Sequence, residues 1–424
     1  MANYKVVDAD RLDGDLTAVA DAIREKTGAA DALVFPEDYV SGVGGLHTFT
    51  PPGTLALDPE EVYRTTRPAD WLPMPVPGDD EIYMLGMLME GVDNQFLIKL
   101  AFTGNCTVEF GTLVDGVFTA KKSAVPVSDV MFYHGLNYED YGNETAEGFR
   151  QYLVRIQGAG ISKVEGGANA TDQPAFIVDF ACGIPLSFNF SANGGQGNSN
   201  WNKTFCQTRY LRFLGNGSPG VTSMFAMHSG ALKAVTVQGQ ISEGYFTFAF
   251  SNCRSLQAID PELLRDRSVA INYAFDSCAL SMLPDVPVTV TNMSYAFNNS
   301  ALQEFHGEWT NTAQTANLGG AFSICRYLRE VRNLDISSAT NVNDMFTVCV
   351  ALQKLTFAGS TTPGGWTISL TSTKLSHTAL VRMLESLPAA VNAATITITG
   401  NPGALALTDE EIAIATAKNW TVTI

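Results

Sequence analysis

Few residues of this 424-residue chain combine the types and spacing that chemistry requires. The segment 134–140 gathers His134 with Glu139 and Asp140, a set that could serve acid–base or metal chemistry. The other histidines are scattered along the chain, with no H-x-x-x-H spacing. Acidic residues are mostly exposed in folded proteins, so we interpret this segment as a solvated surface loop.

The glycines Gly215, Gly217 and Gly220 match the pattern G-x-G-x-x-G and follow an apolar run at 210–214. A dinucleotide site would need a helix that opens at these glycines within a βαβ unit. Pro219 interrupts the motif and repeats follow it, so we predict a turn. The sequence contains no G-x-S-x-G, and it singles out no carboxylate pair in an apolar setting for glycoside cleavage. We therefore expect a protein that is not an enzyme, with no catalytic residue, cofactor or metal.

The seven cysteines are an odd number and lack the paired C-x-x-C spacing of zinc sites. Four of them occupy one position of a repeated phrase, where a serine takes their place once: Cys253, Cys278, Ser300, Cys325 and Cys349. A small, half-apolar side chain suits a tight turn inside a core. We predict that the cysteines are buried free thiols, so that oxidation or chelators should leave the fold unchanged.

The repeated phrase itself predicts the architecture. It consists of a phenylalanine, a small residue or cysteine three or four positions later, and then a leucine, and it occurs six times between residues 222 and 352. Its phenylalanines are spaced by 25, 25, 22, 25 and 24 residues, and they are Phe225, Phe250, Phe275, Phe297, Phe322 and Phe346. This period falls within the range of leucine-rich repeats, about 20–29 residues. Units of that size must stack into a solenoid to bury their apolar faces, and solenoids usually bind rather than catalyse.

We divide the chain into four parts, and the predicted fold class is mainly β with short helices. Residues 1–47 form a helical leader for attachment or oligomerisation, because apolar residues recur at helical spacing between 16 and 23. Short apolar runs between turn residues predict a β-sandwich at 54–160. Residues 173–365 form the predicted solenoid, with clear repeats at 222–360.

The fourth part, 366–424, is predicted as an α/β cap that covers the last repeat, since a solenoid end would otherwise expose apolar surface. A helix is expected at 376–387, and the capping box Thr408-x-x-Glu411 predicts another that runs through Ala417. Strands are expected at 395–399 and 420–424. Trp71, among prolines near the start of the predicted sandwich, has two interpretations: it lies on a binding face or packs against the sandwich.

Composition and charge exclude several classes of partner. The net charge of −17 disfavours nucleic acid and anionic membranes, both of which reward Lys and Arg. The first residues lack the apolar region of a signal peptide. The longest apolar patch, at 84–89, is too short to span a membrane. We expect a protein that is made in a cytosol, is not inserted in a membrane and does not leave by the usual secretory route.

The repeat resembles a known family. The segment 328–352, which includes Leu334-Asp-Ile-Ser-Ser-Ala-Thr-Asn-Val342 and Met345-Phe346, resembles the BspA-like leucine-rich repeat. Such repeats are common in surface proteins of mycoplasmas, of gut bacteria and of their phages. The likeness covers 222–360, although Met227-His228 replaces the cysteine in the first repeat.

The two ends of the chain carry a second likeness. The leader segment 20–36 resembles the start of many tail and virion proteins from phages of Firmicutes, and 61–75 is similar to the segments that follow it there. The ending 407–422 resembles the usual close of these repeat arrays. The resemblance implies a phage or prophage structural protein, a virion appendage of the tail-fibre or receptor-binding type. Such a protein is made in the bacterial host cytoplasm and resides in the virion.

From this resemblance we expect the solenoid to bind a host cell-surface glycan or protein. The leader is expected to bind other virion proteins, and the chain to form a homo-oligomer. Candidate ligand contacts are the aromatic residues outside the repeated phrase, which are Tyr245, Tyr273, Tyr295, Trp309 and Tyr327. Packing in the core is the alternative role for each of them.

Three alternative functions stay open. The first is a capsid or tail decoration protein that does not adhere to the host. The second is a bacterial surface adhesin, which should carry an export signal. The third is a polysaccharide depolymerase, an enzyme class that is hard to recognise from sequence.

Overall fold

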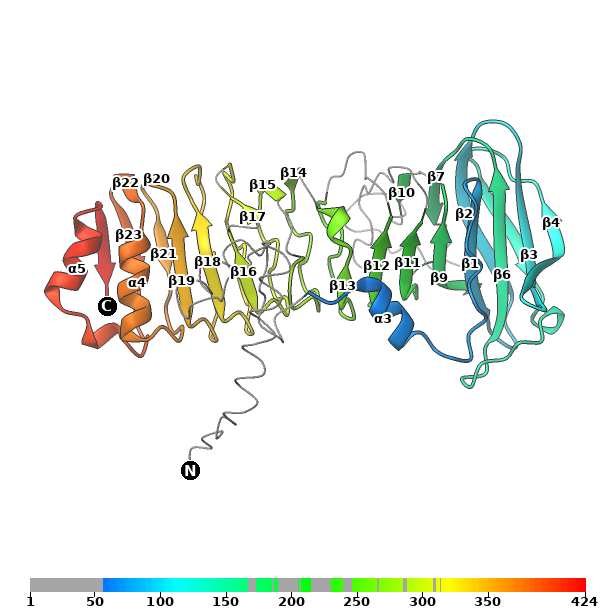
Figure 1. Cartoon of the computed structure of the whole chain (residues 1–424), viewed down its shortest axis with the longest axis horizontal. Helices are drawn as coiled ribbons and strands as arrows, with labels where there is room; N and C mark the ends of the chain where they lie inside the picture. The colour runs from blue at the N-terminus through cyan, green and yellow to red at the C-terminus, as the bar shows by residue number, and fades with distance from the viewer. Residues whose placement is uncertain are drawn as a thin grey trace, which may run out of the picture. The chain divides into compact units, whose positions relative to one another are not determined.

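The computed structural model divides into two compact units, residues 1–55 and 56–424. It describes residues 56–166, 173–184, 187–189, 205, 207–214, 230–238, 246–264, 267–284, 288–307, 310–312 and 314–424 (Figure 1). The predicted leader at 1–47 and the glycine motif at 215–220 lie outside the described residues. The described part is mainly β with short helices, as predicted.

One eight-stranded sheet forms the first half of the second unit (Figure 1). In spatial order its strands are β13 (Ala258–Ile259), β12 (Ala234–Val237), β11 (Tyr210–Phe213), β9 (Phe176–Cys182), β1 (Glu81–Leu88), β6 (Arg150–Gly158), β3 (Cys106–Val114) and β4 (Val117–Ala124). Strand β1 pairs antiparallel with β6 and β9, whereas β9, β11, β12 and β13 pair in parallel. The predicted division between 54–160 and 173–365 therefore falls within one continuous sheet.

A second sheet packs on the antiparallel part of the first. It contains β10 (Ser187–Asn189), β7 (Ile161–Gly166), β2 (Asn94–Phe102) and β5 (Met131–Leu136), and β8 (Gln173–Pro174) also pairs with β2. The two apolar faces meet where Phe96 of β2 packs edge-on against Phe110 of β3, with ring centroids 5.2 Å apart. Alternate residues of a strand point to opposite faces, so Ile82 and Met84 of β1 join this core.

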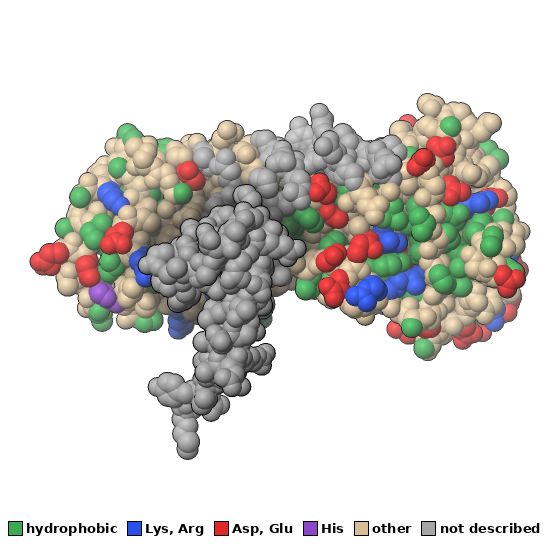
Figure 2. Space-filling view, in the orientation of Figure 1, with side chains coloured by type: hydrophobic (Ala, Val, Ile, Leu, Met, Phe, Trp, Pro, Cys, Tyr) green, Lys and Arg blue, Asp and Glu red, His purple; other side chains and the backbone are tan. Residues whose placement is uncertain are grey.

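The opposite face of the eight-stranded sheet is covered by helix α3 (Pro59–Thr66), which contacts β12 and β13, and by the segment that follows the helix. Leu85 and Met87 pack there with Val62 of the helix and with Trp71 in a separate apolar cluster. Trp71 is 7% exposed, and the guanidinium groups of Arg67 and Arg209 lie 5.5 and 5.1 Å from its ring. Of its two interpretations, the packing role is the one that the structure supports. Figure 2 shows acidic and basic side chains side by side over this region.

Parallel strands continue along the rest of the chain (Figure 1). They form four further sheets: β14 (Arg267–Ala270), β15 (Val288–Asn292) and β17 (Thr310–Asn311); β16 (Glu304–His306), β18 (Glu330–Asp335) and β19 (Lys354–Ala358); β20 (Thr361–Gly364) and β22 (Ala389–Asn392); β21 (Thr367–Ser369), β23 (Ala394–Thr397) and β24 (Trp420–Thr423). Every pairing within these four sheets is parallel.

The phenylalanines of the repeated phrase stack into one buried column. Five of them are described, each at most 2% exposed: Phe250, Phe275, Phe297, Phe322 and Phe346. Neighbouring ring centroids are 5.6, 5.4, 5.8 and 5.5 Å apart, with interplanar angles of 22°, 3°, 8° and 5°. Because the phrase recurs at nearly equal intervals, each ring meets the same ring of the next unit.

The backbone around each of these phenylalanines takes the left-handed conformation twice, two residues before and two residues after the ring. For Phe275 the two positions are Tyr273 and Ser277, with φ values of 57° and 54°. The amide N–H groups of Tyr273, Phe275 and Ser277 donate to carbonyls of the next unit at 3.0, 2.8 and 2.8 Å. These bonds satisfy buried backbone donors and hold the left-handed residues in place.

Gly320 takes the first of these positions before Phe322, with φ 63°, and a Cβ there would lie 2.4 Å from Cε1 of Tyr295. We expect Gly320→Ala to lower the free energy of unfolding by about 1–2 kcal/mol from the backbone conformation alone, with a further loss from the clash. Gly91→Ala is the matched control, because Gly91 has φ 73° and open space around its missing Cβ. Urea denaturation of both variants measures the difference. Equal losses in the two variants would contradict the ring contact.

The C-terminal segment forms helices and short strands near the positions that its sequence predicts. Helix α4 (His377–Ser386) begins after the N-cap Ser376, and helix α5 (Asp409–Thr416) has the predicted capping box of Thr408 and Glu411. Trp420 of β24 is buried and donates its indole N–H to the carbonyl of Pro388 at 2.8 Å. Residues of both helices belong to the same apolar core as the phenylalanine column.

Candidate binding surface

Two of the five predicted contact residues meet in a second aromatic column. Phe248 stacks on Tyr273 and Tyr273 stacks on Tyr295, with ring centroids 4.7 and 5.1 Å apart and interplanar angles of 11° and 12°. All three residues have positive φ, because they share the position two residues before the buried phenylalanine. Tyr295 is 36% exposed, so this column lies at the surface.

The stacking restricts what this column can offer to a ligand. Both faces of the Tyr273 ring are covered by its neighbours, and Gly320 lies against Tyr295. Ring edges and tyrosine hydroxyls are therefore the groups available for contact. Sequence reasoning missed Phe248, although its place two residues before Phe250 matches that of Tyr273 before Phe275.

Tyr327 lies elsewhere. It follows Phe322 by five residues, and its side chain is 65% exposed, which makes it the most exposed aromatic side chain of the described residues. An exposed tyrosine combines a large apolar surface with a polar hydroxyl, as binding contacts often do. Tyr245 and Trp309 lie outside the described residues.

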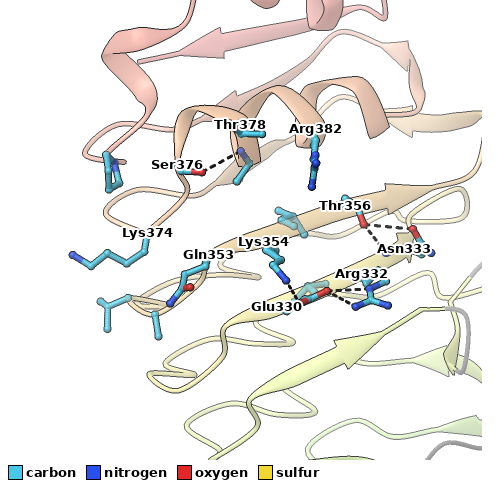
Figure 3. A pocket seen from close by; sticks show the side chains of 16 residues that line it. Glu330, Arg332, Asn333, Gln353, Lys354, Thr356, Lys374, Ser376, Thr378 and Arg382 are labelled. Atoms are coloured by element: carbon cyan, nitrogen blue, oxygen red, sulfur yellow. Dashed lines mark hydrogen bonds and ion pairs between the residues drawn. The ribbon is translucent and has the colours of Figure 1, made fainter. Parts of the chain in front are cut away.

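A groove of about 1110 Å³ is lined by residues of strands β18 and β19 and of helix α4 (Figure 3). Its charged lining comprises one carboxylate and four cations, which are Glu330, Arg332, Lys354, Lys374 and Arg382. Figure 3 shows Arg382 reaching from α4 toward the strands, whereas Arg332 and Lys354 meet at Glu330. Sequence reasoning did not find this groove, because its residues belong to two strands and a helix.

The carboxylate of Glu330 is held by two of these cations. Arg332 Nη2 lies 2.7 Å from Glu330 Oε1, and Lys354 Nζ lies 3.0 Å from Oε2. Burial alone would raise the pKa of Glu330, but the hydrogen bonds and charges of Arg332 and Lys354 lower it. The glutamate is therefore ionised at neutral pH and offsets part of the positive charge on the strands.

The six described cysteines are buried and free, including all four of the repeated phrase, as predicted. The Cys325 thiol donates to the carbonyl of Phe297 at 2.9 Å, and the Cys349 thiol to that of Phe322 at 3.0 Å. Burial raises the pKa of Cys278 to about 12 and that of Cys325 to about 11. These thiols link successive units and stay protonated at neutral pH.

This protonation predicts low reactivity, because the thiolate is the nucleophile. In a Cys206→Ser background, which removes the one cysteine outside the described residues, we expect none of the six described thiols to react with Ellman's reagent at about pH 8. All six should react once a denaturant unfolds the protein. Rapid labelling of the folded protein would contradict the buried arrangement.

The segment around His134 is not the solvated loop that we predicted, because His134 belongs to strand β5, and Glu139 and Asp140 belong to a short 3-10 helix (Tyr138–Asp140). The His134 ring stacks on Phe110 with centroids 4.3 Å apart, and burial lowers the pKa of its imidazole. Glu139 instead pairs with Arg150 at 2.8 Å. Over the described ranges, no group of three or more His, Cys, Asp or Glu side chains is placed to hold a metal ion. In the same ranges no helix has the length and apolar character to cross a membrane.

Comparison of the chain with protein-family models, with curated proteins and with solved structures found no match.

Proposed function

We propose that this protein is a phage virion appendage in which a leucine-rich-repeat solenoid presents a ligand-binding surface to the host cell. The observation that carries the proposal is that several structural features repeat together along the chain. From Phe250 to Phe346 the buried rings, the two left-handed positions and the cysteine position recur at the same intervals. A stack of such units exposes a long surface without requiring an active site.

The side chains outside these columns are the ones free to bind a ligand. In each unit the phenylalanine and the cysteine are buried in the packing, and the left-handed residues form backbone hydrogen bonds to the next unit. Tyr327 belongs to neither column and is exposed, so it is our principal candidate for an aromatic contact with a host glycan or protein. Aromatic residues contribute a large share of binding energy at interfaces.

The virion part of the proposal rests on the resemblance of 20–36 and 61–75 to phage tail and virion proteins, together with the resemblance of 407–422 to the usual close of these repeat arrays. The leader at 1–47 would bind other virion proteins, and the copies would form a homo-oligomer. The first test is immunogold electron microscopy of phage particles with an antibody to the full chain. Label at the tail tip is expected. The absence of label from every particle would overturn the virion assignment.

Adsorption of the full-length protein to host cells tests the binding role. We expect Tyr327→Ala to weaken adsorption about tenfold, which corresponds to about 1.4 kcal/mol. Tyr133→Ala is the matched control, because Tyr133 is 53% exposed but belongs to β5 of the second sheet, outside the repeats. Equal adsorption of both variants and the unchanged protein would exclude Tyr327 as a contact.

One observation favours a second candidate function, a capsid or tail decoration protein that does not adhere to the host. The ring faces of Phe248, Tyr273 and Tyr295 are used for stacking, which suits a purely structural role. Label on the capsid together with no adsorption of the purified protein would support this candidate against the first.

A further inference from the structure

We infer that the groove between β18–β19 and α4 binds an extended anionic saccharide, a sugar chain that carries carboxylate or phosphate groups. This inference deepens the proposed binding function and rests on it. Four cationic side chains line the groove, against the single carboxylate of Glu330. The chain as a whole carries a net charge of −17, so this gathering of cations contrasts with the rest of the protein.

Two of the cations are available to a ligand. Within the described residues, the side chains of Lys374 and Arg382 have no ion pair and no hydrogen bond, and both residues are exposed. The structure holds the other two, Arg332 and Lys354, beside Glu330, with 46% and 67% of their side chains exposed. Arginine offers a planar fork that matches carboxylate and phosphate oxygens, and lysine adds a mobile point charge.

The uncharged lining favours a sugar chain over nucleic acid. Amide and hydroxyl groups of Asn333, Gln353 and Thr378 face the groove together with small apolar groups (Figure 3). Such groups exchange hydrogen bonds with sugar hydroxyls. Proteins that bind single-stranded nucleic acid usually stack its bases on aromatic rings, and none of the residues that line this groove is aromatic.

A β-bulge holds the floor of the groove in shape. The register between β18 and β19 shifts between Val331 and Leu334, so Arg332 and Asn333 stand opposite Thr356 alone. Asn333 has φ 52°, and its amide N–H donates to Thr356 Oγ1 at 3.0 Å. Bulges of this kind redirect side chains, and here the two redirected residues line the groove.

The adjacent strand supports the bulge through Gly307. Its amide N–H donates to the carbonyl of Arg332 at 2.7 Å, and a Cβ at this position would lie 1.9 Å from the carbonyl oxygen of Asn333. The close approach requires glycine. The bulge is therefore fixed before a ligand arrives, which lowers the entropic cost of binding.

Binding of defined polymers to the full-length protein tests the inference by isothermal titration calorimetry. The probes are an oligogalacturonate for carboxylates, a glycerol-phosphate oligomer for phosphates, neutral dextran and a single-stranded DNA oligomer. At least one anionic non-nucleic polymer should bind, and added salt should weaken it because it screens the charges. We expect Lys374→Ala with Arg382→Ala to reduce that affinity at least about tenfold.

The matched control is Arg64→Ala with Arg254→Ala, which removes the same charge from exposed positions that do not line the groove. Its affinity should stay within about twofold of the unchanged protein. An equal loss in the control, equal binding of dextran, or no binding of either anionic polymer would overturn the inference. Tighter groove-dependent binding of DNA would overturn the saccharide assignment.

These polymers require neither particles nor host cells. Absence of particle label or of host adsorption would thus reject the proposed function without changing the polymer result. Absence of polymer binding would reject the groove inference without changing the particle and adsorption results.

Discussion

The substitution Phe322→Ala is expected to lower the free energy of unfolding by about 3–5 kcal/mol, as is typical when a buried phenylalanine is truncated. Phe322 is fully buried and lies in the middle of the column, stacked on Phe297 and Phe346 with centroids 5.8 and 5.5 Å away. The ring of Phe305 packs against it edge-on at 5.0 Å. Truncation leaves a cavity at the contact between neighbouring units, and their coupling holds a stack together.

Urea denaturation followed by circular dichroism measures the loss. Phe322→Leu is the conservative control and should recover more than half of it, because leucine refills part of the cavity. Phe248→Ala truncates a ring of the surface column, where the site is only half-buried, and should cost less. If Phe322→Ala cost no more than Phe248→Ala, the buried column would not be the main contact between units.

The second large effect is expected at the buried ion pair between helix α3 and the eight-stranded sheet. Arg67 Nε lies 2.8 Å from Asp179 Oδ2, and the Asp179 side chain is fully buried in strand β9. The hydroxyl of Tyr63 donates to the same oxygen at 3.2 Å. We expect Arg67→Met to lower the free energy of unfolding by about 3–5 kcal/mol, because it leaves a buried carboxylate without its cation.

This loss should depend on pH. Burial raises the pKa of Asp179 even though Arg67 acts to lower it, and removal of Arg67 should raise that pKa further. A carboxyl whose pKa is higher in the folded state binds a proton more readily there, so stability rises as pH falls through the folded-state pKa. The deficit of Arg67→Met should therefore be smaller at about pH 5 than at about pH 7.

Arg64→Met serves as the control for this pair. Arg64 is 75% exposed and lies 3.8 Å from Glu61, an exposed pair whose loss should cost less than about 1 kcal/mol. Adding Asp179→Asn to Arg67→Met should restore part of the stability, because the buried charge is then removed. Equal losses for Arg64→Met and Arg67→Met would show that the buried pair does not anchor α3.

The sequence alone predicted the features that repeat or depend on neighbouring residues. The interval between phenylalanines predicted a stack of similar units, and in the structure the rings of Phe250 to Phe346 lie stacked on one another. The recurring small residue predicted buried thiols, as Cys325 and Cys349 show. The Thr408 capping box predicted the start of α5, because such a cap requires only residues within one helical turn.

Contacts between distant segments were beyond reach of that reasoning. Tyr273 and Tyr295 were chosen only as aromatic residues outside the phrase. Their shared place two residues before the phenylalanine aligns them in the repeat, but the left-handed backbone that stacks them face to face is visible only in the structure. The pair of Arg67 and Asp179 joins residues 112 positions apart. Strand β9 pairs with β1, so one sheet continues across 160–173, where the sequence had predicted a boundary between two domains.

The groove also shows the difference between features set by neighbouring residues and features set by contacts between distant segments. Periodicity and local capping depend on residues near one another in the chain, so the amino-acid sequence by itself determined the repeat, its buried column and the helical cap. The groove depends on the distance between α4 and the strands, and on a bulge that places Arg332 and Asn333 along it. Such distances follow from the simultaneous packing of many side chains that are far apart in the sequence. Only the tertiary structure decides them.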